Sequence, residues 1–164
     1  MLTTILALAG AALLAIALLG LAFVLGMRRK SRWVQGPVIW FSRRWMNPRQ
    51  MRTAGQPGSY AGIVRHVGRK TGKAYETPVT PVPADDGFLI ALPYGRHASW
   101  LRNVLAAGSA SIVWEGQTYS VEGPEIVPTV DVIEHFPESD RRSFGLMKVD
   151  ECLRVRTVAP GSAS

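Results

Sequence analysis

The stretch GRKTGK at residues 68–73 separates two segments that have the composition of β-strands. The first is YAGIVRHV at residues 60–67. The second is YETPVTPV at residues 75–82, where Pro78 and Pro81 limit the number of ladder hydrogen bonds. Two glycines permit positive φ angles in the loop, so its backbone N–H groups and three cations suit an anion. The alternative is a basic hairpin tip exposed to solvent. A phosphate-binding loop of the nucleotide triphosphatase type is excluded, because its Gly-Lys-Ser/Thr spacing is missing.

A second segment of interest is PYGRHASWLRN at residues 93–103, which follows the apolar strand GFLIAL at residues 87–92. A glycine turn here leads from the end of a strand into the start of a helix. Such a junction is a good place to bind an anion or a flat ring, because helix N-terminal N–H groups point outward.

Together these motifs resemble the deazaflavin-dependent nitroreductase family over residues 33–158. The resemblance is carried by GRKTGK, then TPV at residues 77–79, PYG at residues 93–95 and WLRN at residues 100–103. It implies a split β-barrel similar to the FMN-binding barrels, and an oxidoreductase that uses coenzyme F420. Flavin mononucleotide, or no cofactor at all, are the alternatives that remain open.

The resemblance also implies which residues bind the cofactor. Coenzyme F420 carries a phosphate and a tail of glutamates, which cationic side chains would bind by charge-assisted hydrogen bonds. The ring would lie between the basic loop and the helix start. The implied cofactor-binding residues are Arg69, Lys70, Thr71, Gly72, Lys73, Thr77, Pro78, Val79, Pro93, Tyr94, Gly95, Trp100, Arg102 and Asn103.

The substrate side departs from the family pattern. Nitro-reducing members resemble one another in tyrosines of the C-terminal part, whereas no tyrosine follows Tyr119 in this chain. The corresponding helix offers Phe144, Leu146 and Met147, which make an apolar wall without a phenol. We therefore assign the substrate pocket to Trp40, Phe144 and Met147, and expect a lipophilic substrate such as a quinone or lipid.

The N-terminal segment is apolar, since residues 2–26 contain no charge. As a helix these 25 residues would be about 37 Å long, enough to cross a bilayer core of roughly 30 Å with some tilt. A cleaved signal peptide is the alternative, but its apolar region is usually about 7–15 residues long and follows a basic start. We expect an uncleaved membrane anchor.

The distribution of charge predicts the orientation of that anchor. Residues 27–52 contain eight cations and no acid, whereas the chain from Thr53 onward has 11 cations and 12 acids. Basic residues beside a span stay in the cytoplasm, so we expect a single-pass protein of the cell membrane with a cytoplasmic domain. Nucleic-acid binding explains the charge less well, because the basic residues cluster where anionic lipid headgroups would lie.

Residues 33–51 combine basic and aromatic side chains. Pro37 suits the first position of a helix, and Val38, Phe41 and Trp45 would share one face of it. This helix would either lie in the membrane interface or pack on the barrel.

The remaining chain predicts short strands and few helices. We expect a helix at residues 98–107 ended by Gly108, a hairpin turning at Gly116-Gln117 and a helix over residues 139–149 with Ser139 as its cap. About six strands with few helices suit a mainly β (α+β) fold, a small barrel. The expected divisions are an anchor (residues 1–26), a basic juxtamembrane segment (27–59), a barrel domain (60–158) and a tail (159–164).

Other catalytic constellations are weak. His66, His97 and His135 lack metal-ligand spacing, and Cys152, the one cysteine, fits a small buried side chain in a reducing compartment. The sequence thus predicts a membrane-anchored oxidoreductase that passes hydride from reduced F420 to a quinone or nitro compound. The alternative is a non-catalytic anchored barrel that binds a fatty acid. The number of subunits stays open, with a homodimer as one alternative.

Overall fold

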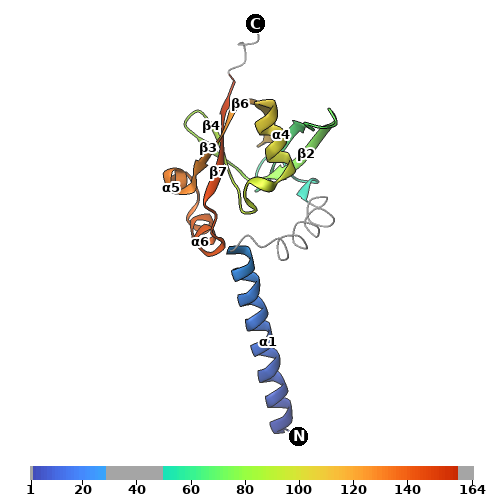
Figure 1. Ribbon diagram of the computed structural model, residues 1–164, viewed down its shortest axis with the longest axis vertical. Coiled ribbons are helices and arrows are strands. Elements are labelled where there is room, and N and C mark those ends of the chain that lie inside the picture. The colour runs from blue at the N-terminus through green and yellow to red at the C-terminus, as the bar shows by residue number, and fades with distance from the viewer. Residues whose placement is uncertain (1, 29–49, 159–164) are drawn as a thin grey trace.

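Seven strands form one antiparallel sheet within the part of the chain that the computed structural model describes. The structure describes the backbone of residues 2–28 and 50–158. Side chains are described for residues 10–26 and 50–158. The strand order is β2-β1-β5-β6-β7-β4-β3, and the sheet curls on itself (Figure 1). The strands are β1 (Gly62–Val67), β2 (Ala74–Val79), β3 (Pro81–Ala84), β4 (Gly87–Ala91), β5 (Ser109–Trp114), β6 (Gln117–Pro128) and β7 (Glu151–Thr157).

The junction between β2 and β3 accounts for the curl. These strands are separated only by Thr80, yet they occupy opposite edges of the sheet order. The two edges must therefore meet at this point. Gly62 of β1 makes the approach possible, because a Cβ there would lie 2.8 Å from Pro81 Cγ and 2.9 Å from Val113 O. The mostly β, curled sheet with short helices agrees with the predicted fold class.

The prediction of one strand over residues 75–82 was wrong. The structure divides it, with Val79 pairing with Gly62 and Pro81 with Ile90. Proline lacks the N–H that a continuing ladder would need, so Pro81 instead begins a new edge strand. The predicted position of the β5–β6 turn also moved, by one residue. The β5–β6 turn lies at Glu115 and Gly116, both with positive φ, and not at Gly116-Gln117.

The helices cover the two faces of the sheet. They are η2 (Gly95–His97), α4 (Ser99–Ala107), α5 (Thr129–Val132), η3 (Ile133–His135) and α6 (Glu138–Met147). Gly108 ends α4 in the left-handed conformation at φ 70°, as the sequence predicted. Ser139 is not the cap of α6, because the helix begins one residue earlier, after Pro137, and the Ser139 hydroxyl contacts Asp140 instead.

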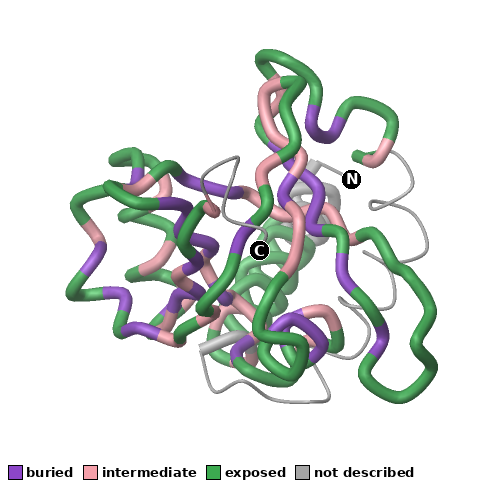
Figure 2. The backbone as a smooth tube through the Cα atoms, turned by 90° about the horizontal axis from the view of Figure 1, so that it is seen from above, coloured by how far each residue is buried: buried purple, intermediate pink, exposed green. Residues whose placement is uncertain are grey.

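Three clusters of buried apolar residues lie among the described residues, and the two larger ones pack on opposite faces of β4 and β7. Phe88 and Ile90 point to the cluster that Leu101 and Val104 of α4 complete. Leu89 points the other way, to a cluster with Phe136 and the fully buried Cys152. Successive side chains of a strand alternate between faces, which explains why the run GFLIAL is apolar throughout. Figure 2 shows exposed positions concentrated at the turns.

Helix α1 (Leu2–Arg28) extends away from the domain, and its C-terminal end lies beside α6 (Figure 1). Large apolar side chains of the helix are exposed, among them Leu13, Leu19 and Phe23. Among the residues whose side chains the structure describes, no helix is both long and apolar enough to cross a membrane. The predicted segment 33–51 lies almost wholly outside the described residues.

Candidate functional site

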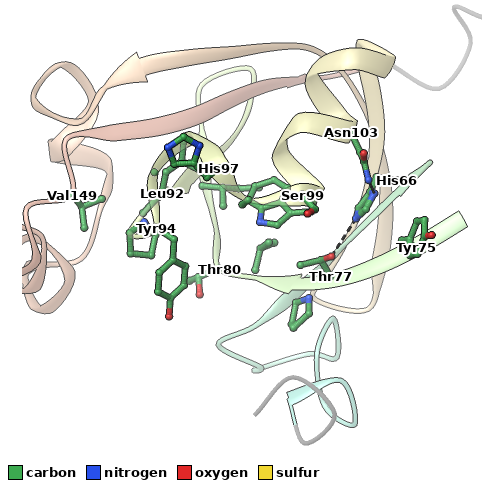
Figure 3. A pocket seen from close by; sticks show the side chains of 18 of the residues that line it. His66, Tyr75, Thr77, Thr80, Leu92, Tyr94, His97, Ser99, Asn103 and Val149 are labelled. Atoms are coloured by element: carbon green, nitrogen blue, oxygen red, sulfur yellow. Dashed lines mark hydrogen bonds between the residues drawn. The ribbon is translucent and has the colours of Figure 1, made fainter. Parts of the chain in front are cut away.

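One cavity of about 1090 Å³ lies beside the β1–β2 hairpin, the β2–β3 junction and the segment that joins β4 to α4. Side chains of α6 line its far side. Figure 3 shows the labelled side chains around it, with His66, Asn103 and Tyr75 on one side and Val149 on the opposite side. The two sequence motifs, at residues 68–73 and 93–103, thus both contribute residues to one cavity.

The first end of the cavity holds a hydrogen-bonded network. Asn103 Oδ1 accepts from Arg69 Nη1 at 2.9 Å and from the Arg69 backbone N–H at 3.3 Å. Asn103 Nδ2 lies 3.2 Å from His66 Nδ1, and His66 Nε2 lies 3.2 Å from Thr77 Oγ1 (Figure 3). The network therefore ties the basic loop to α4 and to β2. Asn103 and His66 are both buried, so these bonds are shielded from water.

The network also fixes the protonation of His66. Because Asn103 Oδ1 already accepts from Arg69, its amide Nδ2 donates to His66 Nδ1, which therefore carries no proton. The proton lies on Nε2 and is donated to Thr77 Oγ1. Burial lowers the pKa of His66 from its ordinary value, which favours the same neutral ring. Tyr75 stacks beside the ring, with centroids 5.8 Å apart.

The basic loop closes this end as a tight hairpin. Gly68 N–H donates to Lys73 O at 2.8 Å. Of the two glycines expected to permit positive φ, Gly72 has a φ of 65°, whereas the φ of Gly68 is not positive. The Thr71 hydroxyl lies 3.3 Å from the Tyr75 hydroxyl. Lys70 lines the cavity and is exposed, and no acid pairs with it among the described residues. The loop thus offers cationic groups to an anion at the rim.

The floor of the cavity comes from the turn between β4 and α4. Gly95 is buried with a φ of 68°, and its N–H donates to Leu92 O at 2.9 Å. The sharp turn places Tyr94 and Trp100 against the cavity, and Trp100 also packs on the core. Arg96 pairs with Glu151 at 2.6 Å and so joins this turn to β7.

The second end of the cavity is mainly apolar, although Asp140 and Ser143 of α6 also line the cavity. Phe144 of α6 packs edge-on against Phe136, with ring centroids 4.9 Å apart and an interplanar angle of 74°. Met147 and Val149 extend this wall, and Leu92 lies on the β4 side. A wall of aliphatic and aromatic side chains suits a lipophilic molecule.

The structure brings most of the proposed site residues together. Those lining the cavity are Arg69, Lys70, Thr71, Thr77, Pro78, Val79, Pro93, Tyr94, Gly95, Trp100, Asn103, Phe144 and Met147. Gly72, Lys73 and Arg102 do not line it: the first two lie at the outer tip of the hairpin, and Arg102 is exposed on α4. Trp40 lies outside the described residues. The binding roles of all these residues stay predictions.

Sequence reasoning missed His66, which it treated only as a strand residue. The alternation of β1, with exposed Arg65 beside buried His66, was the available signal for an inward side chain. Tyr75, Thr80, His97 and Ser99 also line the cavity and were not singled out. His135 is exposed on η3, as expected.

Comparison with known proteins identifies the family. A family model described as F420H(2)-dependent quinone reductase matches residues 42–129, which is more than half of the chain. The chain belongs to this family. It is therefore an F420-dependent oxidoreductase with coenzyme F420 as its cofactor, which confirms these two sequence predictions. Among proteins with curated descriptions, none matches the chain.

Several solved structures resemble the chain distantly. The heme storage protein HutZ from Vibrio cholerae is 15% identical, with a TM-score of 0.47 over 61% of this chain and 82% of HutZ. An F420-H2 dependent reductase (FDR-A) is 16% identical, with a TM-score of 0.46 over 59% and 94% of the two chains. A structure titled F420 reductase is 13% identical, with a TM-score of 0.44 over 66% and 92%. Likenesses at this distance add no argument.

Proposed function

We propose that this oxidoreductase reduces a quinone dissolved in the membrane, with hydride from reduced coenzyme F420, and that α1 anchors it there. The observation that carries the proposal is one continuous cavity with two chemically different ends. Arg69, Lys70 and the His66–Asn103 network make one end polar and cationic. Phe144 and Met147 make the other end apolar.

The polar end fits the cofactor. Arg69 has guanidinium N–H groups beyond the one given to Asn103, and Lys70 has no acidic partner among the described residues, so both suit a phosphate or glutamate carboxylate. Pro78, Val79 and Trp100 offer flat apolar surface for the ring. When bound, the deazaflavin supplies the hydride. The protein orients the ring and excludes water.

The apolar end fits a quinone better than a nitro compound. Aromatic and aliphatic side chains of α6 and Phe136 can bury a hydrocarbon ring and the start of an isoprenoid tail. A soluble nitroaromatic lacks the isoprenoid tail and so would bury less apolar surface against this wall.

Membrane attachment is supported by the N-terminal sequence and by the place of α1. Residues 2–26 are uncharged, eight cations follow up to Arg52, and the described apolar side chains of α1 are exposed. The C-terminal end of α1 contacts α6, which carries the apolar wall. Anchoring by α1 would place that wall at the lipid surface, where a quinone is concentrated, with the domain in the cytoplasm.

The test is oxidation of reduced F420 by the full-length protein in vesicles that contain menaquinone, compared with soluble nitroaromatics at equal concentration. We expect faster turnover of the quinone. Faster turnover of the nitroaromatics would overturn the choice of acceptor. For the anchor, protease added to intact cells should leave residues 53–164 undigested. Digestion from outside, or a mature N-terminus near residue 26, would contradict it.

A further inference from the structure

Tyr94 stands apart from the other polar side chains of the cavity. His66, Asn103 and Thr77 are joined to one another and to Arg69, although Arg69 keeps guanidinium N–H groups beyond the one given to Asn103. The Tyr94 phenol lines the same cavity and is partly buried, yet no hydrogen bond joins its hydroxyl to any described residue. The hydroxyl of this partly buried side chain is therefore free to bond to a ligand atom in the cavity.

The backbone holds this side chain in place. Tyr94 precedes Gly95, whose positive φ and bond to Leu92 O make the turn between β4 and η2 rigid. Figure 3 shows the Tyr94 ring extending into the cavity on the side of Val149, away from His66 and Asn103. The Tyr94 ring therefore lies apart from the His66–Asn103 network that suits the anionic tail.

Of the three phenols that line the cavity, Tyr94 suits this role best, because Tyr60 is 69% exposed and the Tyr75 hydroxyl lies 3.3 Å from Thr71 Oγ1. The Ser143 hydroxyl donates to Asp140 O at 2.8 Å, and the Thr71 hydroxyl pairs with Tyr75. Thr80 and Ser99 are aliphatic alcohols, which hold their proton about as tightly as water and are poor acids. A phenol has a pKa near 10, close to that of a hydroquinone, so a proton can pass between them without a large barrier. Burial raises the pKa of Tyr94, which keeps the phenol protonated at neutral pH.

We propose that Tyr94 is a catalytic residue that donates a hydrogen bond, and then its proton, to a carbonyl oxygen of the quinone. The inference rests on the proposed function. The quinone takes two electrons as hydride from the reduced deazaflavin and one proton from Tyr94, and becomes a hydroquinone. Water at the cavity mouth returns a proton to Tyr94. The reduced deazaflavin gives up one hydride and, to solvent, one proton, so two electrons and two protons are transferred in total.

The decisive variant is Tyr94→Phe in the full-length protein, which keeps the ring and removes only the hydroxyl. We expect kcat for quinone reduction to fall about 100-fold, the lower range for loss of a general acid. F420 affinity, read by fluorescence titration, should change little although Tyr94 is among the residues assigned to the cofactor, because Tyr94→Phe keeps the ring and leaves Arg69, Lys70 and the His66–Asn103 network intact. The matched control is Tyr119→Phe, whose hydroxyl bonds to Gln117 at 3.0 Å outside the cavity. That variant should match the wild type.

Two further readouts separate proton donation from a structural role. Quinones whose hydroquinones are more acidic need the donor less, so the loss in Tyr94→Phe should shrink along a series of increasingly halogenated quinones. Menadione should also bind the protein loaded with oxidised F420 about 2–10-fold more weakly in the variant, the usual worth of one hydrogen bond. If the wild type reduces quinone and Tyr94→Phe is equally active, the role of Tyr94 is overturned while the proposed function stands. A wild type with no quinone turnover would overturn the proposed function as well.

Discussion

The two ends of the cavity are built on different principles. The end at β1, β2 and α4 is held by directional bonds, in which Asn103 links Arg69 to His66 and His66 links onward to Thr77. At the α6 end the cavity wall is made by packing of Phe144 on Phe136, while Arg141, which donates hydrogen bonds to Phe136 O and Glu134 O, does not line the cavity. Directional bonds fix a geometry, whereas apolar contact tolerates variation in shape.

This difference suggests a division of labour. A cofactor that is the same across a family is best bound by a site of fixed geometry. An acceptor that varies between members is best bound by a site that can adapt its shape. Variants at the polar end should therefore change cofactor binding and stability together, and variants at the apolar end should change acceptor use alone. The following predictions test that contrast, in order of decreasing effect.

The largest effect is expected for Asn103→Leu. The substitution is close in size, but it leaves His66 Nδ1 and the Arg69 N–H groups without their partner in a buried site. We expect the free energy of unfolding to fall by about 2–3 kcal/mol and F420 affinity to fall at least about 10-fold. Urea unfolding and fluorescence titration measure the two quantities. Ala106→Leu, exposed on the same helix, is the control and should change neither. Unchanged F420 affinity in Asn103→Leu would show that the network is not part of the cofactor-binding site.

The next effect concerns the two lysines of the basic loop. The sequence assigned both to the cofactor tail, but only Lys70 lines the cavity. Lys70→Glu should weaken F420 binding about 10-fold at low salt, and Lys73→Glu about 2–3-fold, with both losses reduced at high salt because exposed charges are screened. Titrations at two ionic strengths give the comparison. An equal loss for the two variants would mean that the tail extends past the rim of the cavity.

At the apolar end we predict a more selective change. Phe144→Ala removes ring surface from the cavity wall and its contact with Phe136, and should raise the KM for quinone about 3–10-fold. F420 affinity should stay the same. Leu146→Ala is the matched control, since Leu146 is exposed on the same helix and does not line the cavity. A loss of F420 affinity in Phe144→Ala would contradict the separation of the two ends.

The smallest effect is a dependence of stability on pH through His66. Burial lowers its pKa in the folded protein, so the unfolded chain binds more protons as pH falls below about 6.5. Stability should therefore decrease on acidification, by at most about 1.4 kcal/mol per pH unit for one proton. Thermal unfolding between pH 5 and 7.5 should show a smaller slope for His66→Gln than for the wild type. His135→Gln, exposed on η3, should keep the wild-type slope.

The site could be predicted from sequence where function depends on local motifs. The loop at residues 68–73 and the turn after β4 need glycines for positive φ angles, and Gly72 and Gly95 have them. Strand-like composition located β1, and the continuous apolar run at residues 87–92 located β4. The cavity-facing role of His66 was missed, because a histidine in a strand gives no sign of what lies across from it. Asn103, 37 residues away in sequence, supplies its partner only after α4 packs on β1.

The sequence by itself determined the family, the glycine turns, the charge boundary near Arg52 and the apolar character of residues 2–26, because each depends on residues close together in the chain. Only the tertiary structure decided that residues 75–82 form two strands at opposite edges of one sheet. It also decided that Lys70 and not Lys73 lines the cavity, and that Tyr94 places a phenol against it. The physical reason is that curling the sheet at Thr80 brings distant segments together, and this depends on packing across the whole domain.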